Sequence, residues 1–366
     1  MDHRYLHALT LLFGANNQSL IETLRSVPDT KTLWFLSDTE LSSLKTINEK
    51  IRERILSERA TIDPDQEWDR LLKNDIRAVT KQDASYPSLL KEIPDAPTLL
   101  YIRGSYDFSL HQPMVALVGS RKHTAYGEQV AYQLAKELSQ TGIVVVSGLA
   151  FGIDTLAHQA ALATNKETLA VMGNGLADPF LYPKSNVSLA KKIIERGALI
   201  SEYPPETQAQ NYTFPARNRI IAGMTLGTVI IEAAEKSGSL ITASLALEYN
   251  RDVFTVPGSI FSPASVGTND LLKKGARPVT SVRDILEAFP ELIVIPKKNS
   301  SLPCPLEDSL SPEEKNILVI LSHEPLHVDK IIKAARLETS SANSILALLE
   351  IKGLARNIGG MNYIRL

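Results

Sequence analysis

The sequence predicts an α/β protein with a doubly wound parallel sheet at its centre and a small domain on either side. Two patterns predict this fold class. In residues 113–290, continuous apolar runs alternate with amphipathic helical patterns, which is typical of parallel strands buried on both faces. In residues 1–66, and again in residues 313–366, apolar residues recur mainly at helical spacing.

Residues 1–66 read as all-helical. Leu6, Leu9 and Leu12 have helical spacing, and a later series that runs from Leu41 to Ile55 predicts one more helix. Ser37, with Glu40 three residues on, predicts a capping box. The segment is typical of a small helical interaction domain, and the alternative is a packing accessory without a ligand.

Residues 67–290 contain the predicted sheet. A first strand is expected at 98–102, after turn-forming residues that include Pro87 and Pro97. The central strands are predicted at Val115–Val118, Ile143–Val146, Thr168–Met172, Ala198–Ser201, Thr228–Ile231 and Val253–Val256. Helices are expected between several of them, including one over Tyr126–Gln140 and one over Leu240–Tyr249.

Residues 291–312 read as a proline-rich linker, and residues 313–366 as a further domain. Three helical patterns there are followed by two short runs that could pair across Gly359-Gly360, an order typical of a winged helix. This segment carries seven Lys/Arg and six Asp/Glu, so its charge does not mark it as a DNA clamp. A winged helix that reads DNA while the sheet is only structural stays an alternative.

Composition limits the function classes. The chain has 366 residues, a formal net charge of −2 and 44% hydrophobic residues, so any polyanion site must be a local cluster. Cys304 is the only cysteine, which excludes a disulfide framework and a thiolate zinc site. No apolar run has the length of a membrane helix and the N-terminus lacks a signal-peptide layout, so we expect a cytoplasmic protein.

The loop after Val118 is the most informative motif. Gly119-Ser120-Arg121-Lys122-His123 joins a buried strand to a predicted helix, the layout that offers backbone N–H groups to a phosphate. A dinucleotide fingerprint needs a second glycine where this chain has Arg121. The arginine suits a phosphodiester chain crossing the surface better than a buried pyrophosphate.

Three more loops of this kind follow predicted strands, namely 147–154, 173–175 and 236–239. The last contains Ser237 and Gly238. Because the carboxyl ends of parallel strands face one crevice, these loops could pool N–H donors for phosphate. For each glycine taken alone, a tight turn between strand and helix is the alternative.

A second constellation is Phe214-Pro215-Ala216-Arg217-Asn218-Arg219, which follows Tyr212. Arginine binds phosphate through paired hydrogen bonds, and an aromatic ring stacks on any base, so the segment suits single-stranded nucleic acid. The alternative is that Arg217 or Arg219 forms a buried ion pair with Glu202 or Glu232.

Enzyme hypotheses have less support. Ser147, Asp154 and His158 supply the residue types of a hydrolytic triad, but Ser147 lacks a nucleophile-elbow setting. The segment from Gly227 to Glu232 is similar to the signature of Rossmann-like nucleotide phosphoribohydrolases, which leaves such an enzyme as the alternative function. The glutamate stands one residue out of place, which would turn its carboxylate to the other face of a strand and favours a structural role.

Several consecutive motifs together resemble one family, the bacterial DNA-processing protein DprA (Smf). They are Gly119-Ser-Arg121, Ser147-Gly-Leu-Ala-Phe-Gly-Ile-Asp154, Phe214-Pro-Ala-Arg-Asn-Arg-Ile-Ile-Ala-Gly223, Glu232-Ala-Ala-Glu-Lys-Ser-Gly-Ser-Leu-Ile-Thr242 and Val256-Pro-Gly258. The resemblance covers residues 67–290 and extends more loosely to the flanks. It implies an extended Rossmann-like fold, an N-terminal domain like a sterile alpha motif or a helix-hairpin-helix, and a C-terminal winged helix.

The resemblance also implies a function. Members bind single-stranded DNA without sequence preference, load the recombinase RecA during natural transformation and form homodimers, with no cofactor, metal or catalysis. Carried over by motif, Gly119, Ser120 and Arg121 hold phosphate, Phe214 stacks on a base, and Arg217 and Arg219 line the same wall. From charge and location we add Lys122, Lys184, Asn218, Ser237 and Gly238 to the expected DNA-binding residues.

Overall fold

A computed structural model describes residues 2–15, 18–290, 310–322 and 324–365. Contacts divide the chain into two compact units, Met1–Ile293 and Val294–Leu366, which are described separately. The predicted linker at 291–312 falls almost entirely outside the described residues. The N-terminal helices belong to the same compact unit as the sheet.

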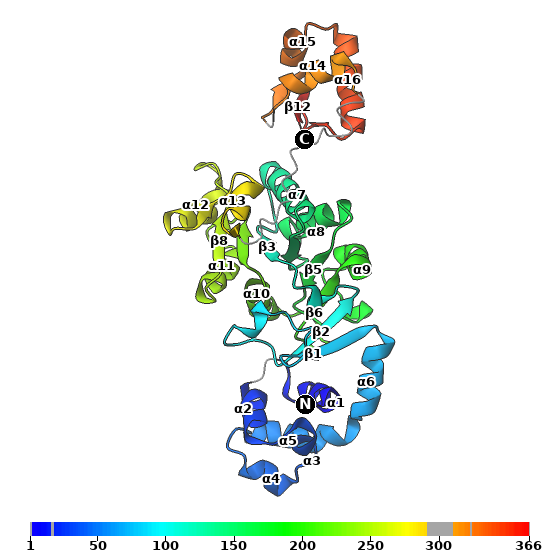
Figure 1. Cartoon of the computed structure of the whole chain (residues 1–366), viewed down its shortest axis with the longest axis vertical. Helices are drawn as coiled ribbons and strands as arrows, with labels where there is room; N and C mark the ends of the chain where they lie inside the picture. Colours follow the sequence, from blue (N-terminus) through cyan, green and yellow to red (C-terminus); the bar gives the residue numbers. More distant parts are fainter. Residues whose placement is uncertain (1, 16–17, 291–309, 323, 366) are drawn as a thin grey trace. The chain divides into compact units, whose positions relative to one another are not determined.

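The first unit is built on a nine-stranded sheet in the order β1-β2-β6-β5-β4-β3-β7-β8-β9 (Figure 1). Its strands are β1 (Ile76–Thr80), β2 (Leu99–Gly104), β3 (Met114–Val118), β4 (Val144–Ser147), β5 (Thr168–Val171), β6 (Ala198–Ser201), β7 (Gly227–Ile230), β8 (Asp252–Thr255) and β9 (Arg277–Pro278). From β6 to β9 all neighbours are parallel, and β1 and β2 extend the sheet with antiparallel pairing. The predicted fold class is confirmed.

Helices cover both faces of this sheet, because its central strands alternate between two cores. Val115 and Leu117 of β3 pack in one core with α7 and α8, whereas Ala116 and Val118 pack in the other with α10 and α11. The helices of this part are α7 (Ala125–Gln140), α8 (Ile153–Ala163), α9 (Val187–Arg196), α10 (Thr213–Gly223), α11 (Ser239–Glu248), α12 (Val266–Lys273) and α13 (Val282–Leu286). The doubly wound arrangement places the N-terminal ends of α8, α10 and α11 next to the loops predicted to bind phosphate.

The N-terminal helices gather beside the β1–β2 edge of the sheet (Figure 1). They are α1 (His3–Phe13), α2 (Gln18–Ser26), α3 (Thr30–Phe35), α4 (Asp38–Ser43), α5 (Glu49–Glu58) and α6 (Pro64–Lys73). Leu6 of α1 packs with Leu71 of α6 and Tyr101 of β2 in a shared core. The helical segment is therefore anchored on the sheet through α1 and α6.

One helix prediction in this segment is wrong. The series from Leu41 to Ile55 forms two helices, α4 and α5, and not one. The side chain of Asn48 accepts a hydrogen bond from the Ile51 N–H at 2.9 Å and starts a new helix there. The capping box of Ser37 and Glu40 is confirmed at the start of α4.

His7 of α1 gives this packing a pH dependence. Burial lowers the pKa of His7 to about 4 from 6.5, and its ring contacts the Tyr101 hydroxyl at 2.7 Å. Between these values the unfolded chain binds a proton that the folded protein does not, so stability falls as the pH drops. We expect this histidine to cost up to about 3 kcal/mol of folding free energy by pH 4.

Urea unfolding of the wild type and of His7→Gln, followed at pH values from 7 to 4, measures this effect. The variant should lose less stability than the wild type over that interval. If the unfolding free energies of the two proteins fell equally between pH 7 and pH 4, His7 would not be the cause of the pH dependence.

In its described residues, the second unit has three helices and a three-stranded sheet. Its elements are α14 (Pro312–Ile320), β10 (Leu326–His327), α15 (Val328–Ala335), α16 (Thr339–Ile351), β11 (Ala355–Asn357) and β12 (Asn362–Arg365). Strands β11 and β12 pair antiparallel on either side of Gly359-Gly360, as predicted. This is a winged-helix arrangement.

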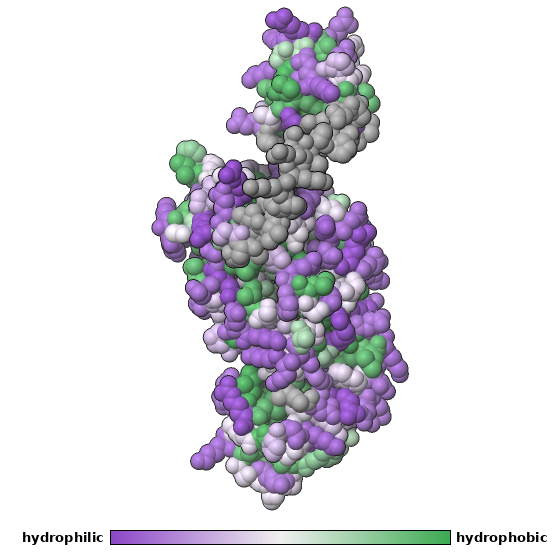
Figure 2. Space-filling model, viewed as in Figure 1, coloured by the Kyte–Doolittle hydropathy of each residue, from purple (hydrophilic) through white to green (hydrophobic). Residues whose placement is uncertain are grey.

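The surface is mixed. On the face shown in Figure 2, hydrophilic residues cover most of the described surface, and apolar residues lie in small patches among them. Among the described residues, none of the helices has the length and apolar character needed to cross a membrane.

Candidate nucleic-acid interface

The sheet brings the four glycine- and serine-rich loops to one edge. They follow β5, β4, β3 and β7, which are neighbours in that order and run parallel. The carboxyl ends of these strands therefore face the same side. This is the arrangement that the sequence predicts for a shared crevice.

The loop after β3 is held as a compact turn. The Ser120 hydroxyl accepts a hydrogen bond from the Lys122 N–H at 3.1 Å and donates one to the Lys122 carbonyl at 2.7 Å. The start of α8 is bonded to this loop, since the Ile153 N–H donates to the Ser120 carbonyl at 3.2 Å. With its backbone fixed in this way, the loop leaves the Arg121 and Lys122 side chains exposed.

The start of α7, however, is not open to a phosphate. The Thr124 N–H donates to one oxygen of Glu232 at 2.9 Å, and the Thr124 hydroxyl donates to the other at 2.5 Å. A carboxylate of the protein thus occupies the position predicted for a bound anion. A phosphate at this loop would have to be held by the arginine and the turn, and not by the helix start.

Arg121 lies over an aromatic ring. Its guanidinium carbon is 5.5 Å from the centre of the Phe214 ring, and the Tyr182 ring lies 5.7 Å from the same ring. Together with Phe151, Asn174 and Gly148, these residues line a small pocket that we call the aromatic pocket. Phe151 and Tyr182 are both more than 40% exposed, so the pocket offers accessible stacking faces beside a cation.

Arg217 does not line this surface, in contrast to the expectation from the sequence. It is buried and donates hydrogen bonds to the Gly148 carbonyl at 2.7 Å and to the Val171 carbonyl. Burial lowers the pKa of Arg217 to about 10, against the opposing charge of Asp154. Arg217 therefore ties together the ends of β4 and β5 beneath the aromatic pocket.

Arg219 also lies inside the protein. It forms a buried ion pair with Glu202, and its Nε lies 3.6 Å from Asp95. Burial raises the pKa of Glu202, and the attraction of Arg219 opposes that shift. The alternative considered for the sequence, a buried ion pair with Glu202, is the one observed, because α10 packs on the sheet on the side that carries this arginine.

The other predicted residues do not line the aromatic pocket. Lys122 and Lys184 are exposed, and Lys184 donates to the Pro179 carbonyl at 2.5 Å, close in sequence to Tyr182. Asn218 contacts the Gly238 carbonyl at 3.4 Å, and Ser237 bonds Ser239 at the start of α11. The structure thus connects α10 with the loop after β7, and the DNA-binding role of these residues stays a prediction.

Sequence reasoning missed Tyr182 and Phe151. Phe151 stands inside the predicted loop 147–154, and Tyr182 follows the loop 173–175 by seven residues. An aromatic residue within or shortly after a glycine-rich loop at this edge is a signal that could have identified both.

The groups considered for catalysis are used elsewhere. The Ser147 hydroxyl donates to the Leu117 carbonyl at 2.6 Å, Asp154 accepts from the Gly148 N–H at 3.1 Å, and His158 contacts Thr168 at 2.8 Å. Glu232 is engaged by Thr124, which supports its structural role. In the part of the chain that the structure describes, no three metal-ligating side chains come together.

The fold and site define a Rossmann-like α/β protein with a cation and stacking rings at the carboxyl edge of its sheet. The family model of DNA recombination-mediator protein A matches residues 77–290, and the DprA winged-helix domain matches residues 302–361. Protein Smf of Synechocystis is 33% identical over 91% of both chains. The DNA processing protein DprA of Streptococcus pneumoniae is 47% identical over 57% of this chain and 72% of its own length.

Two solved structures of DprA proteins are similar to this chain. That of Streptococcus pneumoniae DprA matches with a TM-score of 0.66 and 36% identity, covering 78% of this chain and 97% of that one. That of Helicobacter pylori DprA, which concerns its single-stranded DNA binding mode, matches with a TM-score of 0.53 and 31% identity, covering 59% and 96%. The chain belongs to the DprA/Smf family of DNA recombination mediators.

Proposed function

We propose that this protein binds single-stranded DNA without sequence preference and loads RecA onto it during natural transformation. The observation that carries the binding role is the aromatic pocket, where Arg121 lies over the Phe214 ring and the exposed ring of Tyr182 lies against the same ring. A cation placed over stacking rings suits a strand whose phosphates and bases are both accessible. That the Helicobacter pylori relative binds single-stranded DNA supports this proposal.

The proposed action is binding without catalysis or cofactor. Glu232, on which a phosphoribohydrolase would depend, has both oxygens hydrogen-bonded by Thr124. A winged helix that reads the DNA has less support, since Glu350 is the only charged residue in α16 and phosphate contacts need cations. The proposed protein partners are RecA and a second copy of this chain, and the proposed location is the cytoplasm. The resemblance to the family supports both partners.

Arg121→Ala tests the site. We expect the variant to bind mixed-sequence and poly-dT oligonucleotides more weakly by a similar factor, because a phosphate contact carries no sequence information. The slope of log affinity against log salt concentration should fall by about one unit or less. Fluorescence anisotropy over a salt series measures both quantities.

Lys136→Ala is the matched control, since Lys136 is an exposed cation on α7 outside the aromatic pocket. Its salt slope should stay at the wild-type value, and melting temperatures should be equal for all three proteins. An Arg121→Ala variant with wild-type affinity and salt slope would contradict the proposed site.

A further inference from the structure

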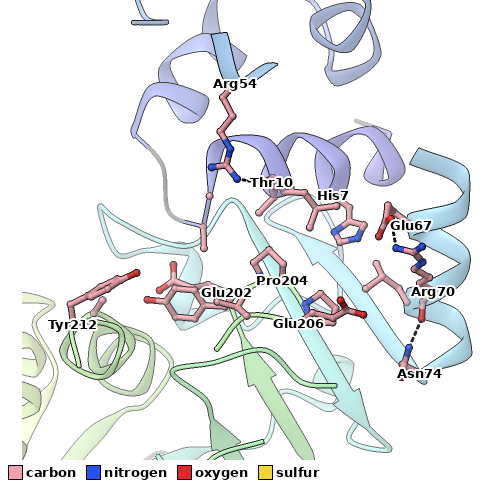
Figure 3. Close-up of a pocket in the computed structure, with 18 residues that line it drawn as sticks. His7, Thr10, Arg54, Glu67, Arg70, Asn74, Glu202, Pro204, Glu206 and Tyr212 are labelled. Atoms are coloured by element: carbon pink, nitrogen blue, oxygen red, sulfur yellow. Dashed lines mark hydrogen bonds and ion pairs between the residues drawn. The ribbon is translucent and has the colours of Figure 1, made fainter. Parts of the chain in front are cut away.

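A second cavity, of about 680 Å³, lies between the N-terminal helices and the sheet (Figure 3). Its wall comes from α1, α5 and α6 on one side, and from residues 202–207 and the start of α10 on the other. A cavity of this volume is in the range that holds small ligands. We call it the junction cavity.

Aromatic rings form part of this wall. Tyr212 is 72% exposed, and Tyr203 lines the cavity with Pro204 and Pro205 after it. Tyr212 and Ala216, one helical turn apart, line the junction cavity, while Phe214 lines the aromatic pocket. The first turn of α10 therefore presents one ring to each of two sites.

The walls of the two sites are joined by backbone hydrogen bonds. In the loop after β5, the Gly175 N–H donates to the Thr207 carbonyl at 2.8 Å, and the Ala177 N–H donates to the Pro205 carbonyl at 3.0 Å. A Cβ on Gly175 would overlap the Pro205 carbonyl, so these two loops are in close contact. A DNA strand that leaves the aromatic pocket over the start of α10 would therefore reach the junction cavity next.

The cavity wall also holds a buried acceptor. Glu202 is 2% exposed and pairs with Arg219 through Oε2, whereas its Oε1 accepts no hydrogen bond from the described residues. A buried carboxylate oxygen without a donor is costly, and an N–H group of a ligand would satisfy it.

Two arginines of the wall are already paired with carboxylates. Arg54 lies 3.0 Å from Glu58, and Arg70 lies 2.6 Å from Glu67. With Glu206 exposed on the same wall, the carboxylates of the cavity outnumber its arginines, so the cavity does not resemble a phosphate site. Its chemistry is a stacking surface with an N–H acceptor, which matches a nucleobase.

We infer that the junction cavity is a second base site for single-stranded DNA, in which a base stacks on Tyr212 or Tyr203 and donates an N–H group to Glu202. This inference rests on the proposed function and extends it. Cytosine has an exocyclic amino group and fits this acceptor. Bases of the bound strand and free nucleotides share this chemistry, so the experiment separates them.

Photocrosslinking of the full chain tests the inference. A cytosine-rich oligonucleotide carrying 5-iododeoxycytidine is irradiated in the complex, and the crosslinked peptides are mapped. We expect crosslinks at Phe214 or Tyr182 and also at Tyr212 or Tyr203. Crosslinks at the aromatic pocket alone would overturn the second site and leave the proposed function standing, and crosslinks at neither site would overturn both.

An affinity measurement gives a second readout. Tyr212→Ala should weaken binding of a long oligonucleotide by about 5- to 100-fold, the effect of one lost base stack, while Tyr212→Phe keeps the ring and should bind as the wild type does. Tyr132→Ala, at an exposed tyrosine of α7, is the matched control. Free dCMP could instead raise the melting temperature of the wild type but not of Tyr212→Ala, while Tyr212→Ala binds the oligonucleotide normally. The occupant would then be a free nucleotide, and the proposed second base site for the DNA strand would be wrong.

Discussion

Replacing Arg219 by alanine should lower the free energy of unfolding of the sheet-containing unit by about 3–5 kcal/mol, because it strands the buried carboxylate of Glu202 without its cation. Both side chains are at most 5% exposed, so water cannot replace the lost partner. Urea unfolding at neutral pH measures the change.

A double variant separates this ionic effect from simple loss of packing. Replacing the pair together, with Arg219→Met and Glu202→Leu, removes both charges and should recover most of the stability lost by Arg219→Ala. A single variant with wild-type stability but weak DNA binding would show that Arg219 reaches the DNA, as the family resemblance implied.

The parallel strands could be predicted because burial on both faces leaves a clear signal. Runs such as Val115–Val118 and Ala198–Ser201 contain almost only residues that favour a strand core, and the observed strands overlap all six predictions. β1 was missed because Arg77 interrupts its short apolar pattern at the antiparallel edge, where one strand face can be exposed.

The N-terminal helices show the limit of spacing arguments. Leu44, Ile47 and Ile51 keep helical spacing across the break between α4 and α5, so periodicity alone cannot reveal it. The break is made by a local competition, in which the Asn48 side chain caps a new helix.

The site was predicted in part. Arg121 and Phe214 come together as the motifs implied, Arg121 from the loop after β3 and Phe214 from the first turn of α10. The positions of Arg217 and Arg219 could not be predicted from residue type, because a guanidinium can donate to a phosphate, a carboxylate or a backbone carbonyl. The position on the helix decides whether such an arginine is buried. Arg217 lies on the same face of α10 as Thr213, Ile220 and Ile221, all of which are buried.

Arg217→Ala should reduce both stability and DNA binding, which distinguishes it from Arg121→Ala. The change removes two hydrogen bonds to the ends of β4 and β5 and leaves the carbonyls of Gly148 and Val171 buried. It also removes the positive charge that opposes the rise in the pKa of Asp154 on burial. We expect a loss of about 3 kcal/mol or more in unfolding free energy.

Binding should weaken by about tenfold even well below the melting temperature, because Gly148 and Phe151 form the wall of the aromatic pocket and lose their anchor. Arg217→Lys keeps the charge, but an ammonium group has no counterpart of the Arg217 Nε–H, which donates to the Asn218 side chain at 3.2 Å, so both effects should be intermediate. Unfolding curves and oligonucleotide titrations on the same samples check the two effects together. Full stability with lost binding in Arg217→Ala would mean that this arginine leaves its buried site to contact the strand directly, and the positioning role would be wrong.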